Sequence, residues 1–339
     1  MGTAKRLSNA FVHRVLNRLY VDGGDYRNTV FIAGTGRSGT TWLEDIINFA
    51  HDHRILFEPF HSAEVPLVSG WNYRQYLRPD EHDERYLVPA RKILSGRVRN
   101  KWIDQLNTKH LVSRRLVKDI RANLILRWIH AHFPEIPIVL LLRHPCAVAS
   151  SKLQLGWKTH LSDFTTQADL VEDHLAPYLD VLESARDDFE RHILLWCVEN
   201  LVPLRQFAAG EMHVCFYEHF CTQPEREARS LTTYLRRDFR PSMLAGMDRP
   251  SALSKQHSAI LCGGSVLDAW RKRISPAQVE RAVELLRAFG LHQLYGAETL
   301  PRIQGEDALE LFQAPDPGYP DPDLRPTVPS FHRTSASFL

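Results

Sequence analysis

The sequence has few cysteines, almost no excess charge and no long apolar run, and each shortage excludes a class of protein. Five cysteines among 339 residues form no Cys-x-x-Cys pair, so we expect buried free thiols in a reducing compartment and no disulfide framework. Lysine and arginine total 42 against 40 aspartate and glutamate, and this balance gives no sign of a nucleic-acid partner. The longest apolar stretches, such as residues 138–142, are far too short to cross a bilayer. With 44% hydrophobic residues, the chain has the composition of a soluble globular protein.

Composition divides the chain into three parts. Residues 1–28 predict an amphipathic helix that docks on the protein body or lies on a membrane surface, and they lack the apolar core and cleavage site of a signal peptide. The apolar face of this helix consists of Phe11, Val12, Val15, Leu16, Leu19 and Tyr20. We therefore expect a cytoplasmic protein, with peripheral membrane contact as the alternative. Residues 29–300 predict the main domain, and residues 301–339, which hold 7 of the 20 prolines, predict an extended tail.

Short β-rich apolar runs alternate with helical patterns along the main domain. The runs cover residues 30–33, 116–118, 138–142 and 213–217, and helical spacing covers residues 42–50 and 123–132. A later helix should begin at Ser275-Pro276-Ala277-Gln278, where serine suits the N-cap and proline the first turn. Alternation of strands and helices is typical of α/β proteins, so we predict a central parallel sheet of about five strands flanked by helices.

A glycine-rich turn follows the first apolar run. Residues 34–41 read Gly-Thr-Gly-Arg-Ser-Gly-Thr-Thr between a predicted strand and a predicted helix, which is the context of a phosphate-binding loop. The spacing of Gly34 and Gly39 matches a Walker A loop, but Thr40 stands where that loop has its lysine. Nor does an apolar strand end in an aspartate clearly suited to Mg²⁺. A P-loop nucleotide kinase or NTPase is therefore a disfavoured alternative.

A second motif begins with Arg143, at the end of the run 138–142, and has Ser151 eight residues later. Together with Arg37-Ser-Gly-Thr-Thr-Trp, it resembles the two phosphate motifs of sulfotransferases that use 3′-phosphoadenosine 5′-phosphosulfate (PAPS). Glu58-Pro59, 21 residues after Arg37, and Lys118-Asp119, 25 residues before Arg143, are similar to positions in the Golgi-type carbohydrate and tyrosylprotein branch. The resemblance implies the P-loop-like sulfotransferase fold and PAPS-dependent sulfonyl transfer, here by a soluble bacterial member.

The resemblance also implies a role for each matching residue. Glu58 would be the general base that removes the acceptor's proton, and Arg37 and Lys118 would stabilise the departing phosphate. Cofactor contacts are implied for Arg37, Ser38, Gly39, Thr40, Thr41, Trp42, Arg143, Ser151 and, in a late serine-and-lysine segment, Ser254. Each of these also has a plainer interpretation as a surface or core residue, and Trp42 suits the core nearly as well as it suits stacking on adenine. Because a sulfonate carries one negative charge, side-chain cations could replace a metal, and no metal is expected.

Two features bear on the acceptor. Aromatic residues crowd the segment after Glu58 and suit either stacking on sugar faces or the core of a lid: Trp71, Tyr73, Tyr76, Tyr86 and Trp102. Residues 91–121 hold ten basic residues and two aspartates, whereas residues 161–190 hold nine acids and one arginine. We expect these blocks to pair with each other, with a basic wall beside an anionic ligand as the alternative. The favoured acceptor is a carbohydrate or polysaccharide hydroxyl. A phenol, a tyrosine or a lipid alcohol is the alternative, and Glu58 argues against a noncatalytic PAPS-binding protein.

Overall fold

Five parallel strands form the centre of the fold. The computed structural model describes residues 24–107, 112, 114–245 and 267–313, and within them the strand order is β2-β3-β1-β4-β5. The strands are β1 (Thr29–Ala33), β2 (His53–Phe57), β3 (Arg114–Asp119), β4 (Ile138–Leu142) and β5 (His213–Phe216). Every neighbouring pair is parallel, so the five carboxyl ends meet at one edge of the sheet.

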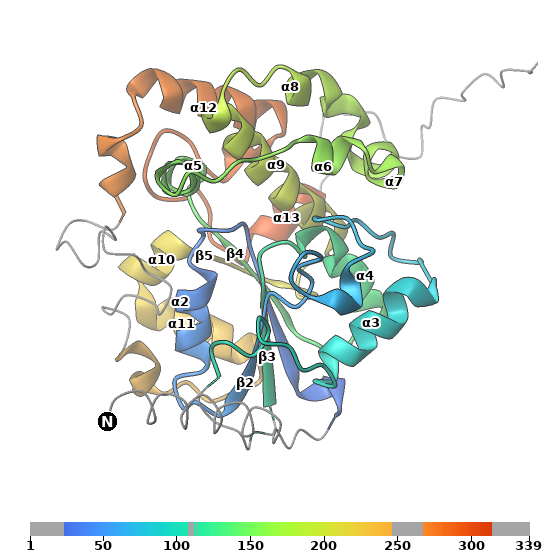
Figure 1. The fold of residues 1–339 in the computed structure, drawn as a ribbon. Coiled ribbons are helices and arrows are strands. Elements are labelled where there is room, and N and C mark those ends of the chain that lie inside the picture. Colours follow the sequence, from blue (N-terminus) through green and yellow to red (C-terminus); the bar gives the residue numbers. More distant parts are fainter. Residues whose placement is uncertain (1–23, 108–111, 113, 246–266, 314–339) are drawn as a thin grey trace, which may run out of the picture.

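Helices surround this sheet. The α-helices are α2 (Thr40–Ile47), α3 (Glu84–Leu94), α4 (Leu126–His132), α5 (Pro145–Gln154), α6 (Ser162–Thr165), α7 (Ala168–Leu170), α8 (Leu179–Glu183), α9 (Asp188–Gln206), α10 (Tyr217–Thr222), α11 (Pro224–Tyr234), α12 (Pro276–Ala288) and α13 (Ala308–Gln313). Shorter 3-10 and π turns are η1 (Tyr26–Asn28), η2 (Pro66–Val68), η3 (Asn123–Ile125), η4 (Val171–Leu175), η5 (Ala176–Tyr178), η6 (Pro241–Leu244), η7 (Ala269–Lys272) and η8 (Leu291–Gln293). In Figure 1, α2, α10 and α11 lie on one side of the sheet, α3 and α4 lie on the other, and α5 to α9 with α12 occupy the upper part of the molecule.

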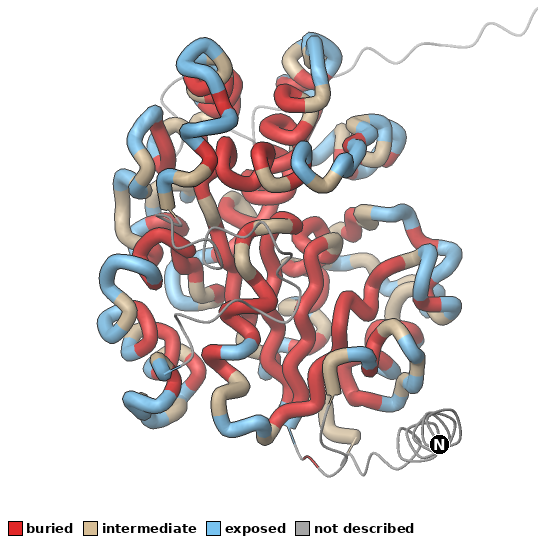
Figure 2. The backbone as a smooth tube through the Cα atoms, turned by 60° about the vertical axis from the view of Figure 1, so that its left-hand side comes forward, coloured by how far each residue is buried: buried red, intermediate tan, exposed pale blue. Residues whose placement is uncertain are grey.

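The sheet separates two apolar cores. Successive residues of a strand point to opposite faces, so Phe31 packs into the larger core and Val30 and Ile32 into the smaller one. All residues of β1 and β4 are buried, which explains why these strands appear in the sequence as continuous apolar runs. Figure 2 shows buried residues concentrated in the central strands and exposed residues in the outer parts of the fold.

The predicted parallel sheet is confirmed, and four of its strands match the predicted runs. Strand β2 was not named from the sequence, because it begins with two polar residues. His53 and Arg54 are nevertheless buried, and Arg54 pairs with Asp104 at 2.9 Å. The predicted helix start is confirmed as well, since Ser275 and Gln278 form a capping box at the beginning of α12.

The two charge blocks do not form one paired surface. Acids of residues 161–190 pair instead with Arg74, Arg78, Lys158, Arg191 and Arg281. Within residues 91–121, Arg115 is fully buried, and Lys118 and Arg121 both pair with Glu58. The acidic block is therefore neutralised by other parts of the chain, and the basic block divides into buried and exposed members.

Both ends of the chain extend beyond the described residues. Residues 1–23, most of the predicted amphipathic helix, lie outside them, as do residues 314–339 and the segment that contains Ser254. The extended tail predicted from residue 301 is in part a helix, because α13 forms there and buries Ala308 and Leu309. No helix in the described part of the chain has the length and apolarity needed to cross a membrane.

Candidate active site

The carboxyl edge of the sheet carries the predicted site residues. The loop of residues 34–39 follows β1, Glu58 follows β2, Lys118 is the penultimate residue of β3, and Arg143 follows β4. The strand order therefore puts Glu58 and Lys118 on one side of the loop and Arg143 on the other. Neighbouring strands lie about 4.8 Å apart, so residues on both sides of the loop can contact the two ends of one ligand.

Two glycines give the loop its shape. A Cβ on Gly34 would lie 2.6 Å from the carbonyl oxygen of Leu141, so β4 leaves no room for a side chain there. Gly39 has a φ of 100°, in the left-handed region that favours glycine. It is also the N-cap of α2 and supplies no side-chain cap, so the first N–H groups of that helix can bind an anion. The hydroxyl of Ser38 is buried and has no partner among the described residues, which fits a ligand oxygen at this position.

Arg37 connects the loop to the second motif. Its φ is 80°, an uncommon conformation for a residue with a side chain. Arg37 Nε donates to Ser151 Oγ at 3.0 Å, and Arg143 Nη1 donates to the carbonyl oxygen of Arg37 at 3.1 Å. The Arg143 guanidinium also lies 4.2 Å from the centre of the Tyr217 ring. The two sequence motifs thus form a single cationic unit.

Glu58 lies between two cations. Its Oε1 is 2.7 Å from Lys118 Nζ, and its Oε2 accepts a hydrogen bond from Arg121. Glu58 has a φ of 43° and is, with Arg37, one of four described non-glycine residues with a positive φ. Strained backbone of this kind is concentrated at functional sites. Sequence and geometry therefore point to the same pair of residues.

The cations around Glu58 keep it ionised. Burial by itself would raise the pKa of this carboxyl group, but the charges and hydrogen bonds of Lys118 and Arg121 outweigh burial, and the pKa lies below its ordinary value. At neutral pH the group is a carboxylate, the form that a general base needs. Each oxygen accepts one hydrogen bond from a cation, and each keeps a second lone pair that can accept a proton from a ligand.

Asp119 holds the backbone around this group. Its Oδ2 accepts from the N–H of Phe60 at 2.9 Å, and its Oδ1 accepts from the N–H of Arg121 at 2.8 Å. Burial raises the pKa of Asp119 to about 6, although the two backbone hydrogen bonds oppose the shift. The adjacent residues Lys118 and Asp119 therefore serve different purposes, since the lysine contacts Glu58 and the aspartate positions the segments that carry Glu58 and Arg121.

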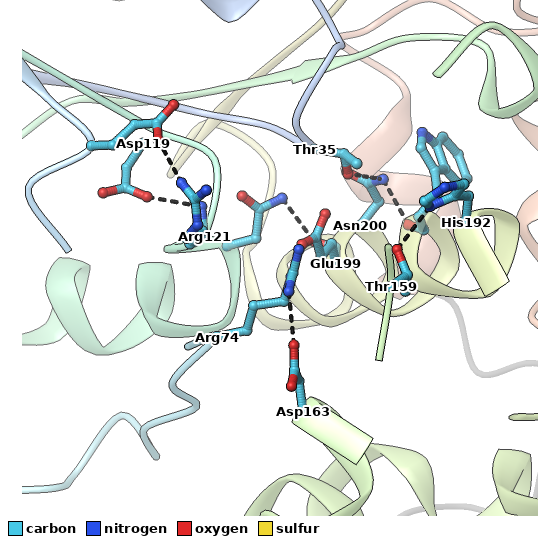
Figure 3. A network of polar contacts seen from close by, with 12 residues as sticks. Thr35, Arg74, Asp119, Arg121, Thr159, Asp163, His192, Glu199 and Asn200 are labelled. Carbon is cyan, nitrogen blue, oxygen red and sulfur yellow. Dashed lines mark hydrogen bonds and ion pairs between the residues drawn. The ribbon is translucent and has the colours of Figure 1, made fainter. Parts of the chain in front are cut away.

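A polar network extends from this site to α9 (Figure 3). Arg74 donates to Glu199 at 2.6 Å and to Asp163 at 3.0 Å. Asn200 Nδ2 lies 3.2 Å from the hydroxyl of Thr35, which connects the loop directly to α9. Figure 3 shows Arg74 and Glu199 between Arg121 on one side and Asn200 on the other. Helix α9 thus supports the site, although its sequence carries no recognisable motif.

The structure brings most of the predicted residues to this edge of the sheet, with two exceptions: Trp42 packs in the core, and Ser254 is not among the described residues. Trp42 is 6% exposed and packs 5.2 Å from Tyr217 and 6.1 Å from Phe220, as a core aromatic does, and its stacking on adenine stays a prediction. Ser254 lies outside the described residues. Within the described residues, no group of three or more histidine, cysteine, aspartate or glutamate side chains could hold a metal ion.

Four residues at the site were missed by the sequence reasoning. Arg121 lies two residues after β3 and Tyr217 directly follows β5, and this position at the carboxyl edge of the sheet was the signal that could have identified them. Lys152 lies four residues after the buried Val148 on α5, so its helical position indicates burial. Asn200 gave no signal, because its contact with Thr35 depends on how α9 packs.

Comparisons with known proteins agree on one family. A family model described as "Sulfotransferase family" matches residues 29–241. A search of curated proteins gave no match. Among solved structures, the sulfotransferase domain from the curacin biosynthetic pathway has 17% sequence identity and a TM-score of 0.42, and the match covers 76% of this chain and 96% of that one. Mouse sulfotransferase SULT7A1 complexed with PAP has 15% identity and a TM-score of 0.40, with 78% and 84% covered. A sulfotransferase from Alicyclobacillus acidocaldarius has 15% identity and a TM-score of 0.34, with 72% and 98% covered.

Proposed function

Because the chain belongs to the sulfotransferase family, we propose that it transfers a sulfonyl group from PAPS to an acceptor hydroxyl, with Glu58 as the general base. The observation that carries this assignment is the position of Glu58, 2.7 Å from Lys118 and beside the loop of residues 34–39. Transfer of a sulfonyl group between two oxygens requires a base for the attacking hydroxyl and a cation for the departing oxygen. A carboxylate and a cation at the same end of a phosphate-binding loop could supply both.

The residues around the loop fit the donor. The N-terminus of α2, the unpartnered hydroxyl of Ser38 and the side chains of Thr40 and Thr41 suit a 5′-phosphate. Arg143 and Ser151 suit a 3′-phosphate, because a guanidinium can donate two parallel hydrogen bonds to a phosphate. A 3′-phosphate distinguishes PAPS from ATP. The missing Walker lysine at Thr40 further disfavours the P-loop kinase or NTPase.

Glu58 would act on the acceptor. A hydroxyl is a poor nucleophile at neutral pH, and a positioned base that removes its proton typically contributes about 10²–10⁴-fold to the rate. The depressed pKa of Glu58 keeps it in the basic form. In this proposal Arg121 holds one carboxylate oxygen in place, and the oxygen that now faces Lys118 accepts the proton.

Lys118 and Arg37 would act on the departing phosphate. As the sulfonyl group leaves, the bridging oxygen gains negative charge, and cations fixed beside it stabilise the transition state more than the ground state. Lys118 Nζ is already at this end of the loop, and Arg37 is fixed by its hydrogen bond to Ser151. We infer that these side chains make a divalent cation unnecessary.

We propose a carbohydrate as the acceptor, and an exposed basic segment supports this choice. Arg97, Arg99 and Lys101 are exposed, and the chain that follows them runs beside β2, where Phe57 donates to the carbonyl of Ile103 at 3.0 Å. These cations could bind an anionic glycan. Of the nearby aromatic residues, Trp71 and Tyr76 are buried and belong to the core, whereas Tyr73 is 36% exposed and could contact a sugar ring.

An acceptor screen with radiolabelled PAPS tests the function. Transfer to at least one hydroxyl compound is expected, with sulfated or carboxylated polysaccharides as the best acceptors. Failure of every carbohydrate, together with transfer to phenols or lipid alcohols, would reject the carbohydrate proposal and keep the enzyme class. Absence of PAPS binding in calorimetry would reject the class.

The basic segment gives a second test of the acceptor. Replacing Arg97, Arg99 and Lys101 together by alanine should raise the KM for an anionic polysaccharide and leave PAPS binding unchanged. Added salt should raise the same KM in the unmodified protein, because exposed charges are screened. A KM that responds to neither change would favour a neutral small-molecule acceptor.

A further inference from the structure

Lys152 is a buried lysine of α5 that the proposed chemistry does not use. It directly follows Ser151 and is 2% exposed. In the part of the chain that the structure describes, no hydrogen bond or ion pair engages its ammonium group. Lysine is rarely buried so completely without an anionic partner, because an isolated charge loses its hydration there. The missing partner therefore points to a ligand.

The surroundings of Lys152 are mostly cationic. Burial lowers its pKa to about 7. Glu199 of α9 opposes this shift, whereas Arg74, Arg121 and Arg37 add to it. These charges come from four separate segments of the chain, so Lys152 lies where those segments converge. Arg37 belongs to the phosphate-binding loop and Arg121 contacts Glu58, which puts Lys152 close to both the donor and the acceptor side of the site.

Neighbouring groups on the packed helices do not neutralise this lysine. On α9, His192 lies near enough for Lys152 to lower the pKa of its ring, which burial already lowers to about 4, so that ring is neutral at pH 7. Just after η7, Arg273 donates to Ser150 at 3.0 Å and adds a further cation beside α5.

The one acid facing Lys152 pairs with Arg74 through one of its two oxygens. Glu199 Oε1 accepts from Arg74 at 2.6 Å, while its Oε2 is buried and has no partner in the described part of the chain. Arg74 is bound by Asp163 as well, and Arg121 by Glu58. The other cations near Lys152 thus have acceptors, and Lys152 alone retains an ammonium group with none among the described residues.

We propose that Lys152 is an oxyanion-binding residue of the active site, and that its ligand is either the sulfonate to be transferred or an acidic group on the acceptor. This inference rests on the proposed function. Both ligands share the chemistry that the site lacks, a negative charge with oxygen acceptors. We do not propose the 3′-phosphate as the ligand of Lys152, because Arg143 and Ser151 are already proposed to bind it.

Calorimetry with two nucleotides distinguishes the sources. PAP carries the 3′- and 5′-phosphates of PAPS but no sulfonate. If Lys152 binds the sulfonate, Lys152→Gln should weaken PAPS about 10- to 100-fold and leave PAP nearly unchanged. If Lys152 binds the acceptor, both nucleotides should keep their affinity. In that case the KM for p-nitrophenyl β-glucuronide should rise by a similar factor, while that for the neutral p-nitrophenyl β-glucoside should not.

Proton uptake provides a readout that a purely structural role would not give. Binding of an anion should charge Lys152 fully, so the unmodified protein should take up a proton when the ligand binds above pH 7. Titrations in buffers of different ionisation enthalpy measure this uptake, and Lys152→Gln should abolish it. Lys152→Arg, which keeps a cation, should recover part of the affinity. Lys158→Gln is the matched control, because that lysine is exposed and pairs with Asp188.

Two results would overturn the proposal. The first is Lys152→Gln protein that matches the unmodified protein with PAP, PAPS and both glycosides. The second is an equal loss of affinity for PAP and PAPS, which would mean that the substitution damages the phosphate sites. Either result leaves PAPS binding by the unmodified protein intact. If the unmodified protein does not bind PAPS at all, the proposed function fails, and this inference fails with it.

Discussion

Lys118 Nζ lies 2.7 Å from Oε1 of Glu58, so the cation and the base proposed for opposite sides of one reaction are paired with each other. The pair stabilises two buried charges that would each be costly alone. It also lowers the proton affinity of the base. A donor phosphate that attracts Lys118 would release Oε1 and leave Glu58 held by Arg121. Donor binding would thereby prepare the site for the acceptor.

Glu58→Gln should lower kcat by about 100-fold or more, the usual size of a lost general base. Gln is nearly isosteric, so affinity for PAPS should change little. Calorimetry and initial rates on the best acceptor measure the two effects, with Glu64→Gln, an exposed glutamate nearby, as the control. Near-normal kcat in Glu58→Gln protein would remove Glu58 from the role of base.

The acid limb of the pH–rate profile should lie at unusually low pH. Lys118 and Arg121 hold the pKa of Glu58 below its ordinary value of 4.5 despite burial, so acidification protonates the base only below that value. We expect kcat/KM to show no loss attributable to Glu58 between about pH 5 and pH 7. A limb centred within this range that moves in Glu58→Asp protein would contradict the expectation.

Arg143→Ala should weaken PAPS by about 1.5–3 kcal/mol, the value of a charge-assisted hydrogen bond. Adenosine 5′-phosphosulfate lacks the 3′-phosphate and should lose less. The loss should not vanish, because Arg143 also donates to the carbonyl oxygen of Arg37. Calorimetry with both nucleotides checks this, and Arg229→Ala, an exposed arginine of α11, is the control. Equal losses would exclude Arg143 from the 3′-phosphate site.

Transfer should continue in excess EDTA. Arg37, Lys118 and Arg143 supply positive charge along the loop, and a sulfonate carries less charge to neutralise than a γ-phosphoryl group. The assay compares initial rates in protein treated with EDTA and in the same protein after Mg²⁺ is restored. A rate that disappears with EDTA and returns with Mg²⁺ would show that the side-chain cations are insufficient.

Glu44→Gln should stabilise the protein increasingly as pH rises. Glu44 is buried in α2, and burial raises its pKa to about 8, although nearby Lys118 opposes the shift. The unfolded chain releases this proton near pH 4.5, so the folded state binds more protons between these values and its stability falls with increasing pH. Gln removes the titration. The melting temperature of Glu44→Gln protein should exceed that of the unmodified protein by a larger margin at about pH 8 than at about pH 5. The two margins should differ by several degrees. Glu284→Gln, on an exposed site, should show no such trend.

The sequence predicted the parts of the site that depend on local order. The loop of residues 34–39 and Arg143 directly follow apolar strands, and parallel strands bring such positions to one edge whatever the remaining chain does. Glu58 was identified by its resemblance to a family position, because β2 begins with buried polar residues and gives a weak strand pattern.

Other parts of the site depend on packing between distant segments. Arg121 follows β3 and reaches Glu58 at the end of the neighbouring strand β2, and Lys152 is buried where α5 packs on α9. Their positions after a strand and on a helix indicate where these residues lie, but no sequence spacing reveals which groups surround them. For Trp42 the sequence motif suggests a contact with a ligand, but in the structure its ring packs against Tyr217 and Phe220.

Under the proposed function, the hydrogen bond from Arg143 to the backbone of Arg37 should make recognition of the donor cooperative. A phosphate that orders Arg143 also orders the loop, so a second phosphate at the loop meets a segment whose conformational entropy has already been reduced. The coupling is reciprocal, because whichever end binds first strengthens the other by the same factor. A fragment that carries only one phosphate should therefore have less than half of the binding free energy of the whole ligand. A short contact between two arginines thus favours the intact nucleotide over its breakdown products.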